Sequence, residues 1–221
     1  METSRRQLQA ASTFRIHRYP AALIDRWTLA DGRSVLVRPV LPQDAALQQQ
    51  FVRGLSPMSR YRRFHAGVLE LSGDLLDYLT QVDYRSHLAL LAETFDARGD
   101  EAQVAEARYV LRDADDGIDA GVADFAIAVA DDWQGCGLGS RMLEALVTSA
   151  RDGGVRRLEG SVLADNEPMR GLLRARGWRI RRDPEDARLV IGWLDLEPAY
   201  ACVARASLEA RAGRALERVP C

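Results

Sequence analysis

Apolar and polar positions follow one another along the chain in short segments that predict a succession of strands and helices. Segments such as 34–40 and 87–95 have the length and composition of strands, and polar turns separate them. Elsewhere apolar residues recur every three or four positions, as on the buried face of a helix. Strands are predicted at 27–29, 34–40, 87–95, 104–111, 122–130, 155–163, 177–182 and 189–196, and helices at 42–54, 58–65, 73–82, 140–152 and 166–176. This order predicts an α/β fold with a mixed, mostly antiparallel sheet and helices on both faces.

The segment between the strand at 122–130 and the helix at 140–152 carries the strongest functional signal. It reads Gln134-Gly135-Cys136-Gly137-Leu138-Gly139-Ser140. A glycine-rich turn at the start of a helix directs backbone N–H groups and the positive end of the helix dipole at one point. Glycine is needed there because a side chain would block an anion or forbid the backbone angles. The segment therefore predicts a site for a phosphate or pyrophosphate.

Three known types of phosphate-binding loop are candidates for this segment. A turn that only reverses the chain direction and binds nothing is the alternative. A Walker loop ends in Gly-Lys-Ser/Thr, and this segment has no lysine. A dinucleotide-binding turn has the spacing Gly-x-Gly-x-x-Gly, which differs from the Gly-x-Gly-x-Gly found here. The third pattern, Gln/Arg-x-x-Gly-x-Gly, is matched by Gln134, Gly137 and Gly139. In this the chain resembles the GNAT superfamily of acetyl-CoA-dependent N-acyltransferases, whose loop holds the pyrophosphate of coenzyme A.

Other segments narrow this resemblance to one branch of the superfamily. The Leu-Ser-Pro segment at 55–64, the hairpin at 19–39 and the strand segment at 107–110 are similar to those of bacterial protein lysine acetyltransferases. The resemblance covers about residues 20–197. It implies acetyl-CoA as co-substrate, no metal, and a primary amine as acceptor, either a small molecule or a protein lysine. In that branch a nucleotide-binding or acyl-CoA-synthetase-like region often accompanies the domain, and none is recognised in these 221 residues.

The resemblance also implies which residues hold the coenzyme. The strand before the loop would lie along the pantetheine arm through Ile127, Ala128 and Val129. The loop would hold the pyrophosphate through Gln134, Gly135, Cys136, Gly137, Leu138, Gly139 and Ser140. The next helix would begin beside the arm with Asn166 and Met169, although Asn166 is equally suited to cap that helix. The family commonly has a tyrosine seven residues after this Asn, as an acid toward the leaving thiolate, and here the position is Leu173.

Acetyl transfer to an amine calls for a base, because a lysine amine has a pKa of about 10.4 and attacks only when neutral. Asp124 occupies the position at which the related lysine acetyltransferases carry their catalytic Glu. A carboxylate in an apolar strand is costly without a role or a partner, which also favours a function for Asp124. The alternatives are an Asp that faces solvent or one that pairs with an arginine such as Arg108. Glu106, on the neighbouring strand, is the second candidate base.

The predicted helix at 58–65 carries Tyr61 and Phe64 on one face and Arg60, Arg62 and Arg63 around the other. One interpretation is a helix that packs on the core and leaves its arginines in water. The other is a lid on the acceptor side whose arginines meet an acidic substrate or a coenzyme phosphate. The pattern alone leaves both open.

Two other classes of function compete with an acyltransferase. The leucine at position 173 and the shorter carboxylate at position 124 are compatible with a catalytically silent acyl-CoA sensor that regulates a partner. A plain interaction domain, in which the glycine-rich loop binds nothing, is the other rival. Coenzyme binding and thiol release would distinguish the three.

Length, charge and cysteine content limit the remaining interpretations. The 221 residues (24.5 kDa) allow one domain at 19–197, with a loose N-terminal arm at 1–18 and an Ala/Arg-rich C-terminal tail at 198–221. A net charge of −2 and a pI of about 6.0 argue against nucleic-acid binding, and the apolar runs are too short for a membrane span. Cys136, Cys202 and Cys221 have no disulfide or metal spacing, so a cytoplasmic protein is expected. The tail is expected to form a loosely attached helix, with formation of a homodimer or fraying as alternatives.

Overall fold

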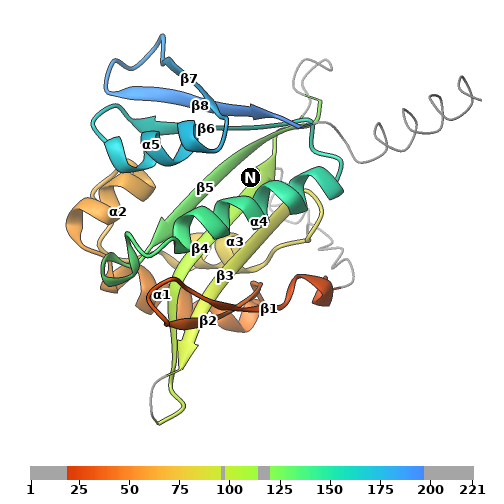
Figure 1. Ribbon diagram of the computed structural model, residues 1–221, viewed down its shortest axis with the longest axis vertical. Helices are drawn as coiled ribbons and strands as arrows, with labels where there is room; N and C mark the ends of the chain where they lie inside the picture. Colours follow the sequence, from red (N-terminus) through yellow and green to blue (C-terminus); the bar gives the residue numbers. More distant parts are fainter. Residues whose placement is uncertain (1–18, 96–97, 114–119, 197–221) are drawn as a thin grey trace, which may run out of the picture.

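An eight-stranded sheet organises the computed structural model, in which residues 19–95, 98–113 and 120–196 are described. Figure 1 shows helices on both faces of this sheet. The strands are β1 (Asp25–Thr28), β2 (Ser34–Pro39), β3 (His87–Phe95), β4 (Glu101–Leu111), β5 (Val122–Val129), β6 (Arg157–Leu163), β7 (Arg179–Arg182) and β8 (Leu189–Asp195). The helices are α1 (Ala45–Gly54), α2 (Pro57–Phe64), α3 (Gly73–Thr80), α4 (Leu138–Asp152) and α5 (Glu167–Ala175), with 3₁₀ turns η1 (Ala21–Leu23), η2 (Pro42–Asp44) and η3 (Asp131–Trp133).

The strand order is β1-β2-β3-β4-β5-β6-β8-β7, and each neighbouring pair is antiparallel except β5 and β6. The predicted α/β fold with a mixed, mostly antiparallel sheet is therefore confirmed. Most predicted elements keep their place with small shifts at their ends; the strand expected at 104–111, for example, begins at Glu101. The helix expected at 42–54 starts as the 3₁₀ turn η2 before α1 begins. The expected arm at 1–18 and tail at 198–221 lie outside the described residues.

The two faces of the sheet pack against different helices. On one face α4 and α5 contribute Leu146 and Leu173 to the largest apolar core. On the other face α1 and α3 form a smaller core around Val52. Because side chains alternate along a strand, Ile127 of β5 packs on the first core and Ala128 on the second. Helices thus cover both faces of β5 from Phe125 onward, which explains why Phe125 to Val129 form a continuous apolar run rather than an alternating pattern.

The sheet opens between β5 and β6. These parallel strands pair at three positions only, and the pairing ends at Asp124 and Glu159. Beyond this point β5 stays with β4 and β6 stays with β8, so the two strands separate. At the start of the gap the ring of Phe125 lies against Gly160, where an added Cβ would come within 2.7 Å of the ring. From Phe125 to Val129, the edge of β5 that faces β6 has no strand partner within the described chain.

Neither a membrane span nor a metal site is found in the described part of the chain. None of its helices combines the length and the apolar composition that crossing a bilayer requires. Its His, Cys, Asp and Glu side chains form no group of three or more that could hold a metal ion. Cys136, the cysteine that falls within the described ranges, is free.

Candidate active site

The gap between β5 and β6 opens into a cleft of about 590 Å³. Residues Asp124 to Val129 of β5 form one side of it, and α2, the loop before α4, β6 and the start of α5 form the others. The lining residues outside β5 are Ser59, Arg62, Arg63, His65, Gln134, Gly135, Gly137, Gly139, Ser140, Gly160, Ser161, Val162, Asn166, Pro168, Met169 and Leu172. This size and this mixture of apolar and polar groups are typical of a small-molecule site.

The glycine-rich loop closes one end of the cleft and leads directly into α4. Gly137 caps the helix with a φ of 89°, and Gly135 has a φ of 77°; both lie in the left-handed region that other residues rarely adopt. A Cβ at either position would meet no atom within 4 Å. These glycines are therefore required by backbone conformation, and they leave open space beside the unpaired N–H groups at the start of a 15-residue helix. A pyrophosphate fits such a position.

Polar side chains fasten this loop to β5 and α2. The side-chain amide of Gln134 donates to the carbonyl oxygen of Val129 at 3.0 Å and to Oγ of Ser59 at 3.3 Å. The carboxylate of Asp131 accepts hydrogen bonds from Oγ of Ser56 at 2.7 Å and from Oγ of Ser59 at 2.8 Å. The loop, the end of β5 and the start of α2 are thus held together as one wall of the cleft.

The structure gathers the residues of the predicted coenzyme site around this cleft, with two exceptions. Cys136 donates through Sγ to the carbonyl oxygen of Trp133 at 2.9 Å and packs against the core. Leu138 is fully buried, and neither side chain lines the cleft. Asn166 lines the cleft, but its Oδ1 accepts from the backbone N–H of Met169 at 3.3 Å, so its side chain caps α5.

Asp124 lies at the end of the cleft where β5 and β6 part. The Asp124 side chain is 56% exposed, so it does not carry the cost of a buried carboxylate. The alternative of an Asp that faces solvent and pairs with an arginine fits this geometry, but the arginine is not Arg108. Arg112, the residue after β4, donates to both oxygens of Asp124 at 2.6 and 3.2 Å, and to Glu159 of β6 at 3.1 Å. Hydrogen bonds to these two carboxylates raise the pKa of Arg112.

Glu106 lies on β4 opposite Ala128 and is fully buried. Its oxygens accept hydrogen bonds from Arg63 at 2.7 Å, from Arg108 at 2.8 Å and from Gln48 at 3.0 Å. Burial alone would raise the pKa of Glu106, but the two arginines outweigh it and lower the pKa to about 2. Such a carboxylate is a weak proton acceptor. The geometry suits Glu106 to holding α2 on the sheet rather than to taking a proton.

Comparison with known proteins assigns this arrangement to a family. The model of the acetyltransferase (GNAT) family matches residues 78–178, which include the opened strand β5 and the glycine-rich loop. The protein named acetyltransferase PA5475 from Pseudomonas aeruginosa is 36% identical over 174 residues, which are 78% of this chain and 90% of that protein. The chain belongs to the GNAT acetyltransferase family. It is therefore an acyltransferase, and the co-substrate of this family is acetyl-CoA.

Two further GNAT relatives agree with this assignment. Acetyltransferase Pat from Mycolicibacterium smegmatis is 36% identical over 167 residues, which are 76% of this chain and 47% of Pat. The chain thus spans about half the length of Pat. Among solved structures, the GNAT domain of S. lividans PAT is 31% identical, with a TM-score of 0.72 over 80% of this chain and 99% of that domain. The resemblance predicted from the glycine-rich loop and the Leu-Ser-Pro segment is confirmed.

This GNAT domain has no hydroxyl group where the family motif commonly carries its tyrosine. Leu173 is fully buried in the core. It packs tightly against Gly192, where an added Cβ would lie 2.8 Å from Cδ1 of Leu173. The position therefore serves packing, and among the described residues that line the cleft there is no tyrosine.

The three arginines of α2 lie in three different environments. Arg60 donates to two carbonyl groups at the end of α1, at 3.1 and 2.6 Å. Arg63 reaches inward to Glu106, and its side chain is 11% exposed. Arg62 lines the cleft. The interpretation with all three arginines in water is therefore wrong for Arg63, because this side chain is buried in an ion pair. The pair leaves no local pattern in the sequence, because its two residues are 43 positions apart.

Arg176 is a residue near the coenzyme loop that the sequence did not single out. Its Nε donates to Oγ of Ser140 at 2.9 Å, and its Nη1 donates to Glu144 at 3.1 Å. This places a guanidinium group beside the first turn of α4. No local sequence pattern marks this contact, because Arg176 and Ser140 are 36 positions apart.

Glutamine in place of Glu106 is expected to destabilise the domain by about 3–5 kcal/mol, because two arginines then remain buried without a counter-charge. The folded-state pKa of Glu106 lies below its ordinary value of 4.5, so its contribution to stability is present above that pH and is lost as the pH falls toward 2. The free energy of unfolding in urea should fall more steeply below pH 4.5 for the wild type than for Glu106→Gln. Glu101→Gln, at the exposed start of β4, is the control; equal effects of both changes would contradict the role of the buried pair.

Proposed function

We propose that this GNAT domain transfers the acetyl group of acetyl-CoA directly to a primary amine, either of a small molecule or of a protein lysine. The main support is the unpartnered edge of β5, which leads from the glycine-rich loop to Asp124. Val129 and Asp124 are five positions apart, which is roughly 17 Å of extended chain. The amide-bearing pantetheine arm can add to such an edge as another strand would. With the pyrophosphate at the start of α4, the thioester would lie near Asp124.

Asp124 is proposed as the base that takes the proton from the attacking amine. Its exposure at the end of the cleft where β5 and β6 part gives access to water. The guanidinium of Arg112 holds the carboxylate in one orientation and donates to both of its oxygens, which favours a proton relay through water over direct contact. A free N–H group on the β5 edge is available for the negative charge that develops on the thioester oxygen.

Neither a general acid nor an acyl-enzyme is part of the proposal. A thiol with an ordinary pKa of about 8.5 departs as thiolate without much help, so Leu173 is compatible with turnover. The Cys136 sulfur is bonded to a backbone carbonyl and lies outside the cleft lining. The amine is therefore proposed to attack the thioester directly.

An acyl-CoA sensor is the second candidate function. It is favoured by the leucine at position 173, which supplies no acid there, and by the engagement of both Asp124 oxygens with Arg112. A sensor would bind acetyl-CoA and respond to it, but an added amine would not cause release of the thiol. The chain matches about half of Pat, so the activity of the whole of that relative does not decide between the two.

Thiol release from acetyl-CoA in the presence of a panel of amines tests the proposal. The panel should include amino acids, polyamines and lysine peptides, followed by proteome lysines with labelled acetyl-CoA. The enzyme is expected to release one thiol for each amine acetylated, with sequential rather than ping-pong kinetics because both substrates meet in one cleft. Binding of acetyl-CoA without thiol release for any acceptor would support the sensor instead.

A further inference from the structure

Arg62 differs from the other arginines in and beside the cleft because its charge has no partner in the part of the chain that the structure describes. The arginines at positions 63, 112 and 188 each pair with a carboxylate at 2.6 to 2.7 Å. Arg62 lines the cleft from α2, and its Nε is buried without a hydrogen-bond acceptor among the described residues. No described carboxylate forms an ion pair with it either. A buried donor of this kind is unfavourable alone, and a ligand that supplies an acceptor would satisfy it.

We propose that Arg62 binds a carboxylate of the acceptor, so that the preferred substrates are amines that also carry a carboxylate. The inference rests on the proposed acetyl transfer and names its acceptor class. A guanidinium group matches the planar, two-oxygen geometry of a carboxylate. The carboxylate belongs either to a small amino-acid-like molecule or to an acidic residue beside a protein lysine, and the chemistry at Arg62 is the same in both cases.

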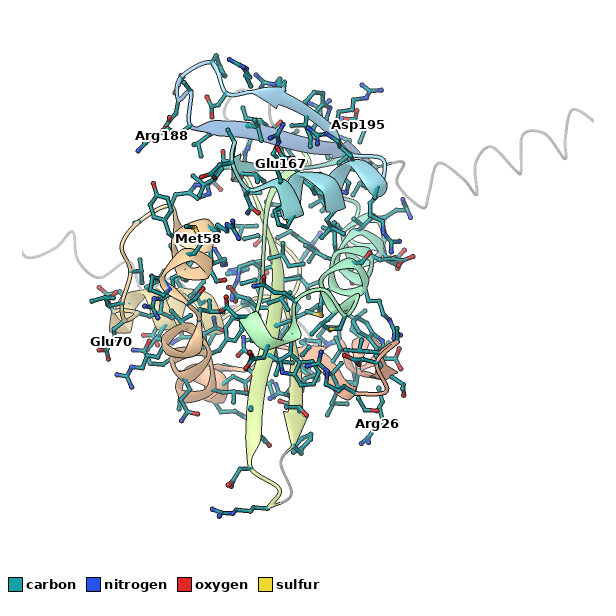
Figure 2. The ribbon with its side chains drawn as sticks, turned by 60° about the vertical axis from the view of Figure 1, so that its left-hand side comes forward. Arg26, Met58, Glu70, Glu167, Arg188 and Asp195 are labelled. Atoms are coloured by element: carbon teal, nitrogen blue, oxygen red, sulfur yellow. The ribbon has the colours of Figure 1, made fainter. Side chains whose placement is uncertain are left out.

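The position of Arg62 along α2 assigns it to the acceptor rather than to the coenzyme phosphates. Ser59, one turn earlier, contacts Gln134 in the glycine-rich loop. Arg62 lies roughly 4.5 Å further along the helix axis, toward the turn between β7 and β8. Figure 2 shows Met58 of α2 and Arg188 of that turn on the same side of the molecule. Between the pyrophosphate and the thioester the coenzyme arm carries no negative charge, so an anion at Arg62 comes from the second substrate.

Within the described ranges, the other titratable groups near Arg62 supply no unpaired anion. Asp124, which lines the same cleft, is paired with Arg112. His65 lines the same cleft, and burial together with the positive charge of Arg63 lowers the pKa of His65, which keeps it neutral at pH 7. Glu106 is already bonded to two arginines. Asp186, which faces His65 from the β7–β8 turn, is paired with an arginine of its own turn. An incoming carboxylate therefore meets an unneutralised guanidinium at Arg62.

Two pairs of acceptors that differ only in charge test this inference. One pair is 6-aminohexanoate and 6-aminohexanamide; the other is a single-lysine peptide with aspartates beside the lysine and the same peptide with asparagines. The wild type is expected to favour the carboxylate member of one pair by roughly ten-fold or more in kcat/KM, as for a charge-assisted hydrogen bond. The pair that shows the preference identifies a small-molecule or a protein acceptor.

Arg62→Gln should abolish this preference and leave the KM for acetyl-CoA unchanged. Arg181→Gln, on the exposed face of β7, removes the same charge outside the cleft and should keep the preference. Should Arg62→Gln fail to fold, Arg62→Lys keeps the charge but not the two-pronged geometry, and it should retain only part of the preference.

No preference in either pair, or a preference that survives Arg62→Gln, would overturn the inference. A raised KM for acetyl-CoA with the preference intact would assign Arg62 to the coenzyme instead. Calorimetry can make the same comparison without turnover, by measuring the Kd of 6-aminohexanoate and of 6-aminohexanamide for the CoA-loaded protein. Equal Kd values would contradict the role of Arg62. Failure of the proposed function is distinct from all of these, because then no amine of either charge is acetylated.

Discussion

Valine in place of Gly137 is expected to abolish the stabilisation of this GNAT domain by acetyl-CoA. The wild type should gain about 2.7 kcal/mol in its free energy of unfolding at a coenzyme concentration of 100 times Kd, because the ligand binds the folded state alone. Gly137 has a φ of 89°, which a β-branched residue does not adopt without strain. The valine side chain would also extend into the open space beside the first turn of α4, where the pyrophosphate is expected. Thermal unfolding with and without acetyl-CoA measures the effect.

Gly154→Val separates loss of binding from loss of stability. Gly154 has a φ of 81° just past the other end of α4, and a Cβ there likewise meets no atom within 4 Å. Both variants should therefore lose about 1–2 kcal/mol through backbone strain. Only Gly154→Val should still be stabilised by acetyl-CoA. A wild type that millimolar acetyl-CoA does not stabilise, or a Gly137→Val variant that it does, is incompatible with a coenzyme site at this loop.

The strands, helices and coenzyme loop could be predicted because local features mark them. Gly32, with a φ of 86°, marks the turn between β1 and β2, and Ser56 marks the start of α2 by accepting from the backbone N–H of Ser59 at 3.2 Å. The loop at 134–140 is contiguous, so its backbone requirement for glycine is visible in a few residues. Sequence patterns are sufficient to predict a structural feature when the residues that form it are close together in the sequence.

The polar network beneath α2 could not be predicted, because its members are distant in sequence. Glu106 lies 43 positions from Arg63 and 58 from Gln48. Sequence reasoning treats each charged side chain by itself and expects it in water or in a functional role, since unpaired charges are rarely buried. The sequence of β5 likewise does not indicate whether a helix covers Asp124. The exposure of Asp124 and its ion pair with Arg112 are therefore evident only in the folded structure.

Replacing Asp124 with asparagine is expected to lower turnover by roughly 10²–10⁴-fold, the usual contribution of a general base. Asparagine keeps the size and shape of the side chain but cannot take the proton of the amine. Stabilisation by acetyl-CoA should persist, because the glycine-rich loop is untouched and lies at the other end of the cleft. Glu159→Gln is the matched control: it removes a carboxylate from the same guanidinium of Arg112 but lies outside the cleft lining, so its turnover should stay close to that of the wild type.

The dependence of turnover on pH tests the same role for Asp124 independently. If Asp124 takes the proton of the amine, the dependence of turnover on pH should differ between the wild type and Asp124→Asn, because the variant lacks the proton acceptor. Asp124→Glu should retain much of the activity, since the longer side chain keeps the carboxylate that takes the proton. If Asp124→Asn instead keeps near wild-type turnover, and the rate climbs toward the amine's own pKa of about 10.4, the domain selects the small neutral fraction of its acceptor and Asp124 is not the base.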